Sequence, residues 1–60
     1  MWIKFKNEDF EEIKVNLEQV TSIRFTTFIV YLVLSNKEEM KIRNSFNDNF
    51  DELVEMLINL

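Results

Sequence analysis

The sequence has no cysteine, histidine, glycine or proline among its 60 residues. Without cysteine it cannot form a disulfide or a thiolate metal site, and without histidine it lacks the commonest metal ligand and general base. A cysteine-free composition is typical of cytoplasmic proteins, and Lys4 and Lys6 interrupt the first apolar residues, where a secretory signal needs an unbroken run. We therefore expect a cytoplasmic protein with no metal and no cofactor.

The lack of glycine and proline constrains every reversal of the chain. Turns usually place glycine where the backbone adopts a positive φ angle. In this sequence Asn, Asp, Ser or Lys has to occupy the turn positions. The composition therefore predicts that some non-glycine residues adopt left-handed backbone conformations at an energetic cost.

The chain is short for a protein that folds alone. Residues 1–60 form one domain near the lower size limit for independent folding. The composition is 47% hydrophobic and 13% aromatic, which is too apolar for a disordered chain. Domains of this size commonly add disulfides, metals or association to a small core. The composition therefore favours association.

The most informative segment is the unbroken apolar run of residues 28–34, FIVYLVL. A strand that is wet on one face alternates apolar and polar residues, whereas a strand covered on both faces is continuously apolar. The run is also far shorter than the roughly 20 residues that a membrane span needs. It predicts a central strand with both faces shielded from water, and no membrane association.

Apolar alternation predicts strands in four other places, namely residues 2–6, 10–15, 20–25 and 39–43. For residues 8–19 a helix is the alternative, because Phe10, Ile13 and Leu17 also have helical spacing. Asn16 is expected to cap a tight turn or a single helical turn over residues 16–19.

Thr26 and Thr27 lack any residue that favours positive φ. They are therefore expected to form a bulge or kink rather than a true reversal of the chain.

The C-terminal segment has the spacing of an amphipathic helix over about residues 49–59. Phe50, Leu53, Val54 and Leu57 lie at i, i+3, i+4 and i+7. Asn49 and Glu52 resemble a capping box, and the apolar stripe is expected to widen through Met56, Ile58 and Leu60. The predicted fold class is α+β, with an antiparallel β-meander of four or five short strands and this helix packed on one face.

One short helix covers at most one face of the sheet, and the length of the hairpin loop after Leu34 decides which face that is. With a two-residue loop, the outer face carries Phe28, Val30, Leu32 and Leu34, whereas a three-residue loop exchanges the two apolar sets. Both alternatives stay open at this point. Three explanations then remain for the second face: it curls over itself as in a small barrel, it forms a homodimer or higher oligomer, or it binds another macromolecule.

Basic residues that alternate with core positions could share that outer face. They are Lys4, Lys6, Lys14, Arg24, Lys41 and Arg43. An apolar centre with a charged rim is the anatomy of a protein–protein interface. The candidate interface residues are Trp2, Phe28, Val30, Leu32, Leu34, Lys41 and Arg43.

The sequence predicts that the protein is not an enzyme. It has no residue pattern for a nucleophile with an adjacent base, and its acidic residues 8–12 lack the glycine and the spacing of a calcium-binding loop. No catalytic, cofactor-binding or metal-binding residue is therefore expected.

The leading hypothesis is a small non-enzymatic interaction module that self-associates, or docks on another protein, through an open apolar sheet face. The first alternative is an acidic inhibitor or regulator, of the phage type, that blocks a nucleic-acid-processing enzyme through its acidic loops and helix. The second is a weak single-stranded nucleic-acid binder that stacks bases on Trp2 and on an outward Tyr31. A net charge of −4 argues against nucleic acid as the partner.

Overall fold

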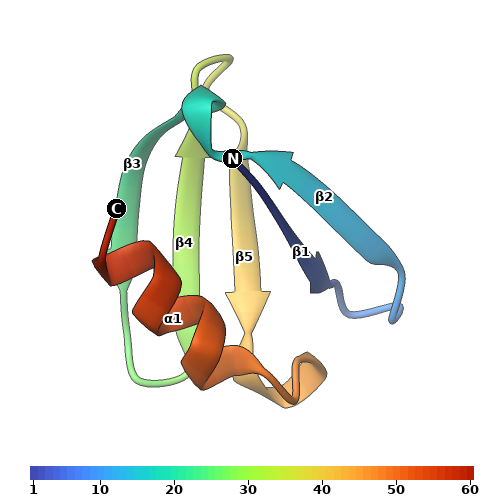
Figure 1. The fold of residues 1–60 in the computed structure, drawn as a ribbon. Helices are drawn as coiled ribbons and strands as arrows, with labels where there is room; N and C mark the ends of the chain where they lie inside the picture. The colour runs from blue at the N-terminus through green and yellow to red at the C-terminus, as the bar shows by residue number, and fades with distance from the viewer.

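The computed structural model describes residues 1–60 as five strands, two short 3₁₀ helices and one α-helix (Figure 1). In chain order these are β1 (Trp2–Lys6), β2 (Glu12–Asn16), η1 (Leu17–Gln19), β3 (Val20–Phe25), β4 (Ile29–Leu34), β5 (Glu39–Arg43), η2 (Asn44–Phe46) and α1 (Phe50–Ile58). The predicted α+β class with a C-terminal helix is confirmed. The antiparallel strands divide between a two-stranded sheet, β1-β2, and a three-stranded sheet, β3-β4-β5.

The segment before η1 is a strand, so the helical alternative for residues 8–19 is wrong. β2 pairs antiparallel with β1, and Ile13 and Val15 lie opposite Phe5 and Ile3. These cross-strand pairs place the β-branched residues on one face, which an extended backbone achieves and a helix does not. The prediction for residues 16–19 is confirmed, because the Asn16 side chain accepts a hydrogen bond from the Glu18 N–H at the start of η1.

Two of the three hairpins, β1-β2 and β4-β5, close with the same three-residue loop. In the loop of residues 8–10, the Phe10 N–H donates to the Asn7 carbonyl at 2.9 Å, and Phe10 has φ 57°. In the loop of residues 35–37, the Lys37 N–H donates to the Leu34 carbonyl at 2.9 Å, and Lys37 has φ 71°. The third residue of each loop is left-handed, at a position where glycine is preferred in three-residue hairpin loops. The predicted left-handed non-glycine residues are thus present.

The loop of residues 35–37 settles which face of β4 is buried. It places Val30 opposite Ile42 and Leu32 opposite Met40, so the three-residue alternative is correct. Val30 and Leu32 are 0% exposed, and Leu34 is half-buried against the core. The expectation that these three residues lie on the outer face is therefore wrong, because one extra loop residue exchanges the two sides of the strand.

The chain makes a true reversal between β3 and β4, so the expectation of a mere kink at Thr26 and Thr27 is wrong. The Thr26 hydroxyl donates to the Ile29 carbonyl at 2.8 Å and accepts from the Ile29 N–H at 3.0 Å. A threonine side chain thus satisfies the backbone groups of the turn, as Ser and Thr hydroxyls can. The irregularity lies at the other end of β3, between Val20 and Ser22.

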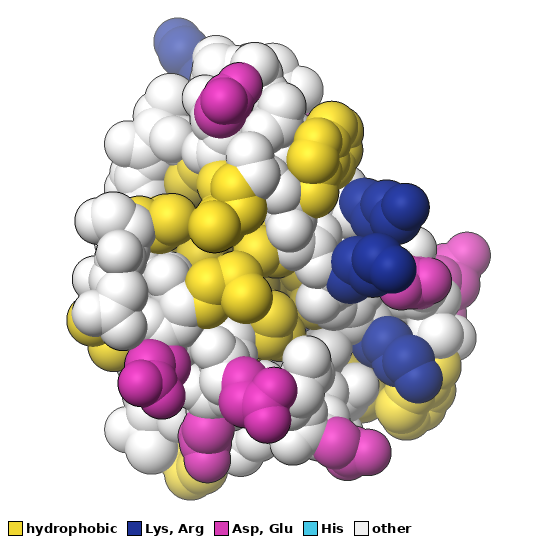
Figure 2. Space-filling view, viewed as in Figure 1, with side chains coloured by type: hydrophobic (Ala, Val, Ile, Leu, Met, Phe, Trp, Pro, Cys, Tyr) yellow, Lys and Arg dark blue, Asp and Glu magenta, His cyan; other side chains and the backbone are white.

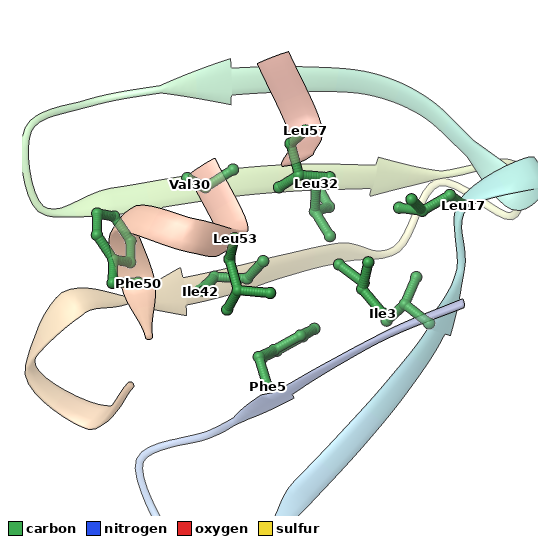
Figure 3. Packing of buried hydrophobic residues seen from close by; sticks show 10 residues of the cluster. Ile3, Phe5, Leu17, Val30, Leu32, Ile42, Phe50, Leu53 and Leu57 are labelled. Carbon is green, nitrogen blue, oxygen red and sulfur yellow. The ribbon is translucent and has the colours of Figure 1, made fainter. Parts of the chain in front are cut away.

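The two sheets and α1 enclose one hydrophobic core (Figure 3). Leu53 of α1 points between Ile42 of β5 and Phe5 of β1, while Leu57 lies over Leu32 of β4 (Figure 3). The ten core residues are Ile3, Phe5, Val15, Leu17, Val30, Leu32, Ile42, Phe50, Leu53 and Leu57. The β1-β2 hairpin and α1 therefore cover the same face of the three-stranded sheet, which we call the inner face.

The helix buries a narrower stripe than its sequence suggests. Phe50, Leu53 and Leu57 are buried, whereas the expected widening of the stripe through Met56, Ile58 and Leu60 is wrong because all three side chains are exposed. Positions i, i+3 and i+7 share one side of a helix, and residues that flank them turn away from the sheet. The capping box is also not formed, since the Asn49 side chain makes no capping hydrogen bond.

A buried side chain joins the two sheets at one end. Asn47 is 4% exposed, and its amide oxygen accepts from the Lys6 N–H at 2.7 Å. Its amide nitrogen donates to the carbonyls of Lys6 at 3.0 Å and Arg43 at 2.9 Å. The amide therefore bonds to both backbone groups of Lys6, as a neighbouring strand would, and every buried side-chain polar atom in the molecule has a partner.

We expect Asn47→Ala to lower the free energy of unfolding by about 3 kcal/mol, since it leaves three backbone groups unpaired near the core. The whole free energy of unfolding of a 60-residue domain is only roughly 3–9 kcal/mol. The variant should therefore be largely unfolded in mild denaturant. Asn44→Ala is the matched control, because the Asn44 side chain is exposed and makes no hydrogen bond. Urea titrations of both variants measure the difference, and equal midpoints would contradict the role of Asn47.

Lys37→Gly should raise the free energy of unfolding by about 0.5–1 kcal/mol, because it removes the steric cost of a left-handed side chain. Phe10→Gly relieves the same strain but loses the edge-to-face contact of Phe10 with Phe46, whose ring centroids are 5.5 Å apart. That contact is worth about 0.5–1.5 kcal/mol, so this variant should gain nothing. Denaturation midpoints test the pair, and a destabilised Lys37→Gly protein would argue against strain in the loop.

Candidate functional site

The candidate site is the face of the three-stranded sheet that points away from α1 and from the β1-β2 hairpin, which we call the outer face. In Figure 1 it faces away from the viewer. The strand registers place the following residues on it: Ser22 and Arg24 of β3, Ile29, Tyr31 and Val33 of β4, and Glu39, Lys41 and Arg43 of β5. No helix or strand packs on this face, because the elements that cover the sheet share the inner core.

The centre of the outer face is apolar. Ile29, Tyr31 and Val33 follow one another along β4 at every second position, and each is half-buried. Their burial comes from side chains on the neighbouring strands, since the face has no covering layer. The central strand thus presents a short apolar row to solvent.

Tyr31 lies between two cations. The Arg24 guanidinium carbon is 4.2 Å from the centroid of the Tyr31 ring, and the Lys41 ammonium nitrogen is 5.9 Å from it. Arg24 and Lys41 are the direct cross-strand partners of Tyr31 on β3 and β5. The quadrupole of an aromatic ring attracts cations at these distances, so Tyr31 positions two positive charges beside the apolar row.

The cations of the outer face have no anionic partner within the chain. The only ion pair within 4.0 Å joins Lys4 to Glu12, at 3.8 Å, on the β1-β2 hairpin. Glu39 is the one acidic residue on the outer face itself, and Glu8 lines a shallow groove beside Lys41 and Arg43 at the edge of β5. The outer face therefore carries unpaired positive charge although the whole chain has a net charge of −4.

The structure brings together some of the predicted interface residues and separates others. Lys41 and Arg43 lie on the outer face as expected. Phe28, 66% exposed, lies at its end and lines a hollow of about 230 Å³ with Ile29 and Arg43. Trp2 is 64% exposed but belongs to the β1-β2 hairpin. Val30, Leu32 and Leu34 lie on the inner face, as described above.

The expectation that six basic residues share one face is also wrong. Lys4, Lys6 and Lys14 lie on the exposed side of the β1-β2 hairpin, which belongs to a different sheet from the strands that carry the other three. Figure 2 shows lysine side chains gathered over β1 and β2. The outer face therefore has half of the cations that alternation along the sequence suggested.

Alternation in the sequence could not identify the residues at the centre of the outer face. Ile29, Tyr31 and Val33 belong to the set that a two-residue loop would have buried. The available signal was the absence of glycine after Asn36, which leaves Lys37 as the left-handed residue of a three-residue loop. The contact between Arg24 and Tyr31 depends on the register of β3 against β4, which the irregularity near Thr21 shifts.

A second surface feature lies where the β1-β2 loop meets η2. Phe10 and Phe46 border an open groove of about 420 Å³, with Phe5 and Asn47 at its base. Its charged lining residues are Lys4, Lys6, Glu12 and Asp48, so it has no excess of either sign.

Two further features of the structure concern metal sites and membrane spans. No group of three or more acidic residues is placed to hold a metal ion. None of the helices is long and apolar enough to span a membrane. Comparisons with protein-family models, with curated proteins and with solved structures give no significant match to this chain.

The contact between Arg24 and Tyr31 should be measurable as a coupling free energy. Arg24→Met and Tyr31→Leu, alone and combined, should give a coupling of about 0.5–1 kcal/mol in chemical denaturation. Lys41→Met combined with Tyr31→Leu should give a smaller coupling, because the ammonium is farther from the ring. Equal, near-zero couplings in both cycles would show that Tyr31 does not position the cations.

Proposed function

We propose that this chain is a non-enzymatic interaction module that docks on protein through the outer face of its three-stranded sheet. The observation that carries the proposal is the row of Ile29, Tyr31 and Val33, which remains partly accessible to solvent on a central strand and is flanked by unpaired cations. In a strand with one face in solvent, the residues on that face are usually polar. An apolar row with a charged rim instead has the composition of a protein interface.

The charge of the rim restricts which proteins fit. Arg24, Lys41 and Arg43 surround the row, and Glu39 offsets only one of them. Charged groups around an interface steer encounters and reject partners of the same sign. The outer face therefore suits a protein surface that combines acidic and apolar side chains.

A single-stranded nucleic acid is the second candidate ligand, since Tyr31 does face outward among three cations. Base stacking requires a free face of the ring. Arg24 stands over the Tyr31 ring at 4.2 Å and occupies that position. These observations favour an acidic protein surface over nucleic acid.

The acidic-inhibitor alternative would use a different part of the molecule. Asp51, Glu52 and Glu55 are exposed on α1, which covers the inner face. An inhibitor of this kind would bind through α1 and leave the outer face free, so substitutions on the outer face distinguish the two proposals.

A pair of neighbouring substitutions tests the outer face. Ile29→Glu places a carboxylate opposite Arg43 on the outer face, so the protein should fold with a melting temperature close to that of the wild type. Val30→Glu places the same charge at a position that is 0% exposed and should unfold the protein. Light scattering over a wide concentration range should then show association of the wild type and a monomer for Ile29→Glu.

A wild-type monomer would leave two outcomes to separate with a hydrophobic dye. Dye binding that Ile29→Glu removes would mean a vacant docking face, as proposed, with another protein as the partner. Absence of dye binding to a monomer, or association that Ile29→Glu does not change, would overturn the proposal.

A further inference from the structure

The outward surface of α1 has the chemistry that the outer face requires. Asp51, Glu55 and Ile58 form one strip along the helix at i, i+4 and i+7, and Glu52 and Met56 form the adjacent strip. Met56 is 42% exposed and Ile58 is 62% exposed. The surface thus mixes acidic and apolar side chains, and Figure 2 shows acidic side chains over the region of α1 with no Lys or Arg among them.

We propose that α1 of a second copy of this chain docks on the outer face, so that copies associate head to tail. The inference rests on the proposed function and names the partner of the same site. The three carboxylates of α1 have no ion pair within the chain, and neither do Arg24, Lys41 and Arg43. Each copy therefore carries one unsatisfied acidic surface and one unsatisfied basic surface.

Charge also decides against the symmetric arrangement. Two outer faces packed against each other would bring Arg24, Lys41 and Arg43 of one copy towards the same cations of the other. Like charges brought together in an interface cost several kcal/mol. Two helix surfaces would bring carboxylates together in the same way. The pairing of unlike surfaces avoids both costs.

The two surfaces match in length. α1 has nine residues and is about 13 Å long at roughly 1.5 Å per residue. The row from Ile29 to Val33 spans four steps of a strand, also about 13 Å at roughly 3.3 Å per step. A helix laid along β4 would place Met56 or Ile58 on the apolar row while its carboxylates reach the flanking cations.

The position of the two surfaces determines the type of assembly. α1 packs on the inner face of the sheet whose other side is the outer face, so the complementary surfaces lie on opposite sides of the molecule. Contacts between unlike surfaces are heterologous and leave a free surface at each end. Association should therefore continue beyond a dimer as the concentration rises.

Neutralising one surface at a time provides the test. The sheet variant Arg24→Gln/Lys41→Gln keeps α1 intact, and the helix variant Glu52→Gln/Glu55→Gln keeps the outer face intact. All four positions are exposed, so circular dichroism should show folded proteins. Each variant alone should be a monomer by sedimentation at low salt, and an equimolar mixture should form a 1:1 dimer that grows no further.

Salt provides an independent readout on the wild-type protein. An increase from about 20 mM to about 500 mM should weaken its association roughly tenfold or more, because the Debye length becomes shorter than the reach of these exposed charges.

The outcomes separate this inference from the proposed function. A helix variant that still associates as the wild type does, while the sheet variant is a monomer, would overturn the role of α1 and leave the outer face as the docking surface. Association of both variants, a mixture that contains only monomers, or a wild type that is monomeric at low salt would overturn head-to-tail association. In the last case, the dye experiment with Ile29→Glu still decides whether the outer face is a docking surface.

Discussion

The fold depends on one amide that joins two sheets which share no strand ladder. Asn47 bonds to both backbone groups of Lys6 and to the carbonyl of Arg43, so the end of β1 is held beside the end of β5. With the hairpin in place, Phe5 lies beside Ile42, Ile3 lies toward Leu17, and both complete the core beneath α1. Because the hairpin and the helix both occupy the inner face, the outer face is left for solvent or for a partner.

The positions of most elements could be predicted from the sequence, because they follow from local patterns. The alternation in residues 2–6 and 39–43 and the helical spacing from Phe50 to Leu57 depend only on neighbours along the chain. The two sides of β4 could not be assigned in this way. When every residue of a strand is apolar, the sequence does not distinguish its buried face from its exposed face. Which face of β4 is buried depended on one additional residue in the loop that contains Lys37.

Of the candidate site, only the positions of charged residues could be predicted from the sequence. Lys41 and Arg43 lie on the outer face because they alternate with Met40 and Ile42, whose apolar side chains require the inner side. The apolar centre was misassigned together with the faces of β4. The contact of Arg24 with Tyr31 depends on the register of β3 against β4, and the irregularity in β3 shifts that register. The residue pattern within one strand does not predict the register between two strands.

The hydrogen bonds between Lys6 and Asn47 also have a consequence for folding during translation. The two residues are 41 positions apart, so their hydrogen bonds can form only after the ribosome has added 41 residues beyond Lys6. The β1-β2 hairpin leaves the ribosome before β5, η2 and α1, yet a lone hairpin is at best marginally stable in water. The apolar side of the hairpin therefore stays exposed until β5, η2 and α1 have been synthesised. A nascent chain stalled before Asn47 would expose that side to chaperones and proteases.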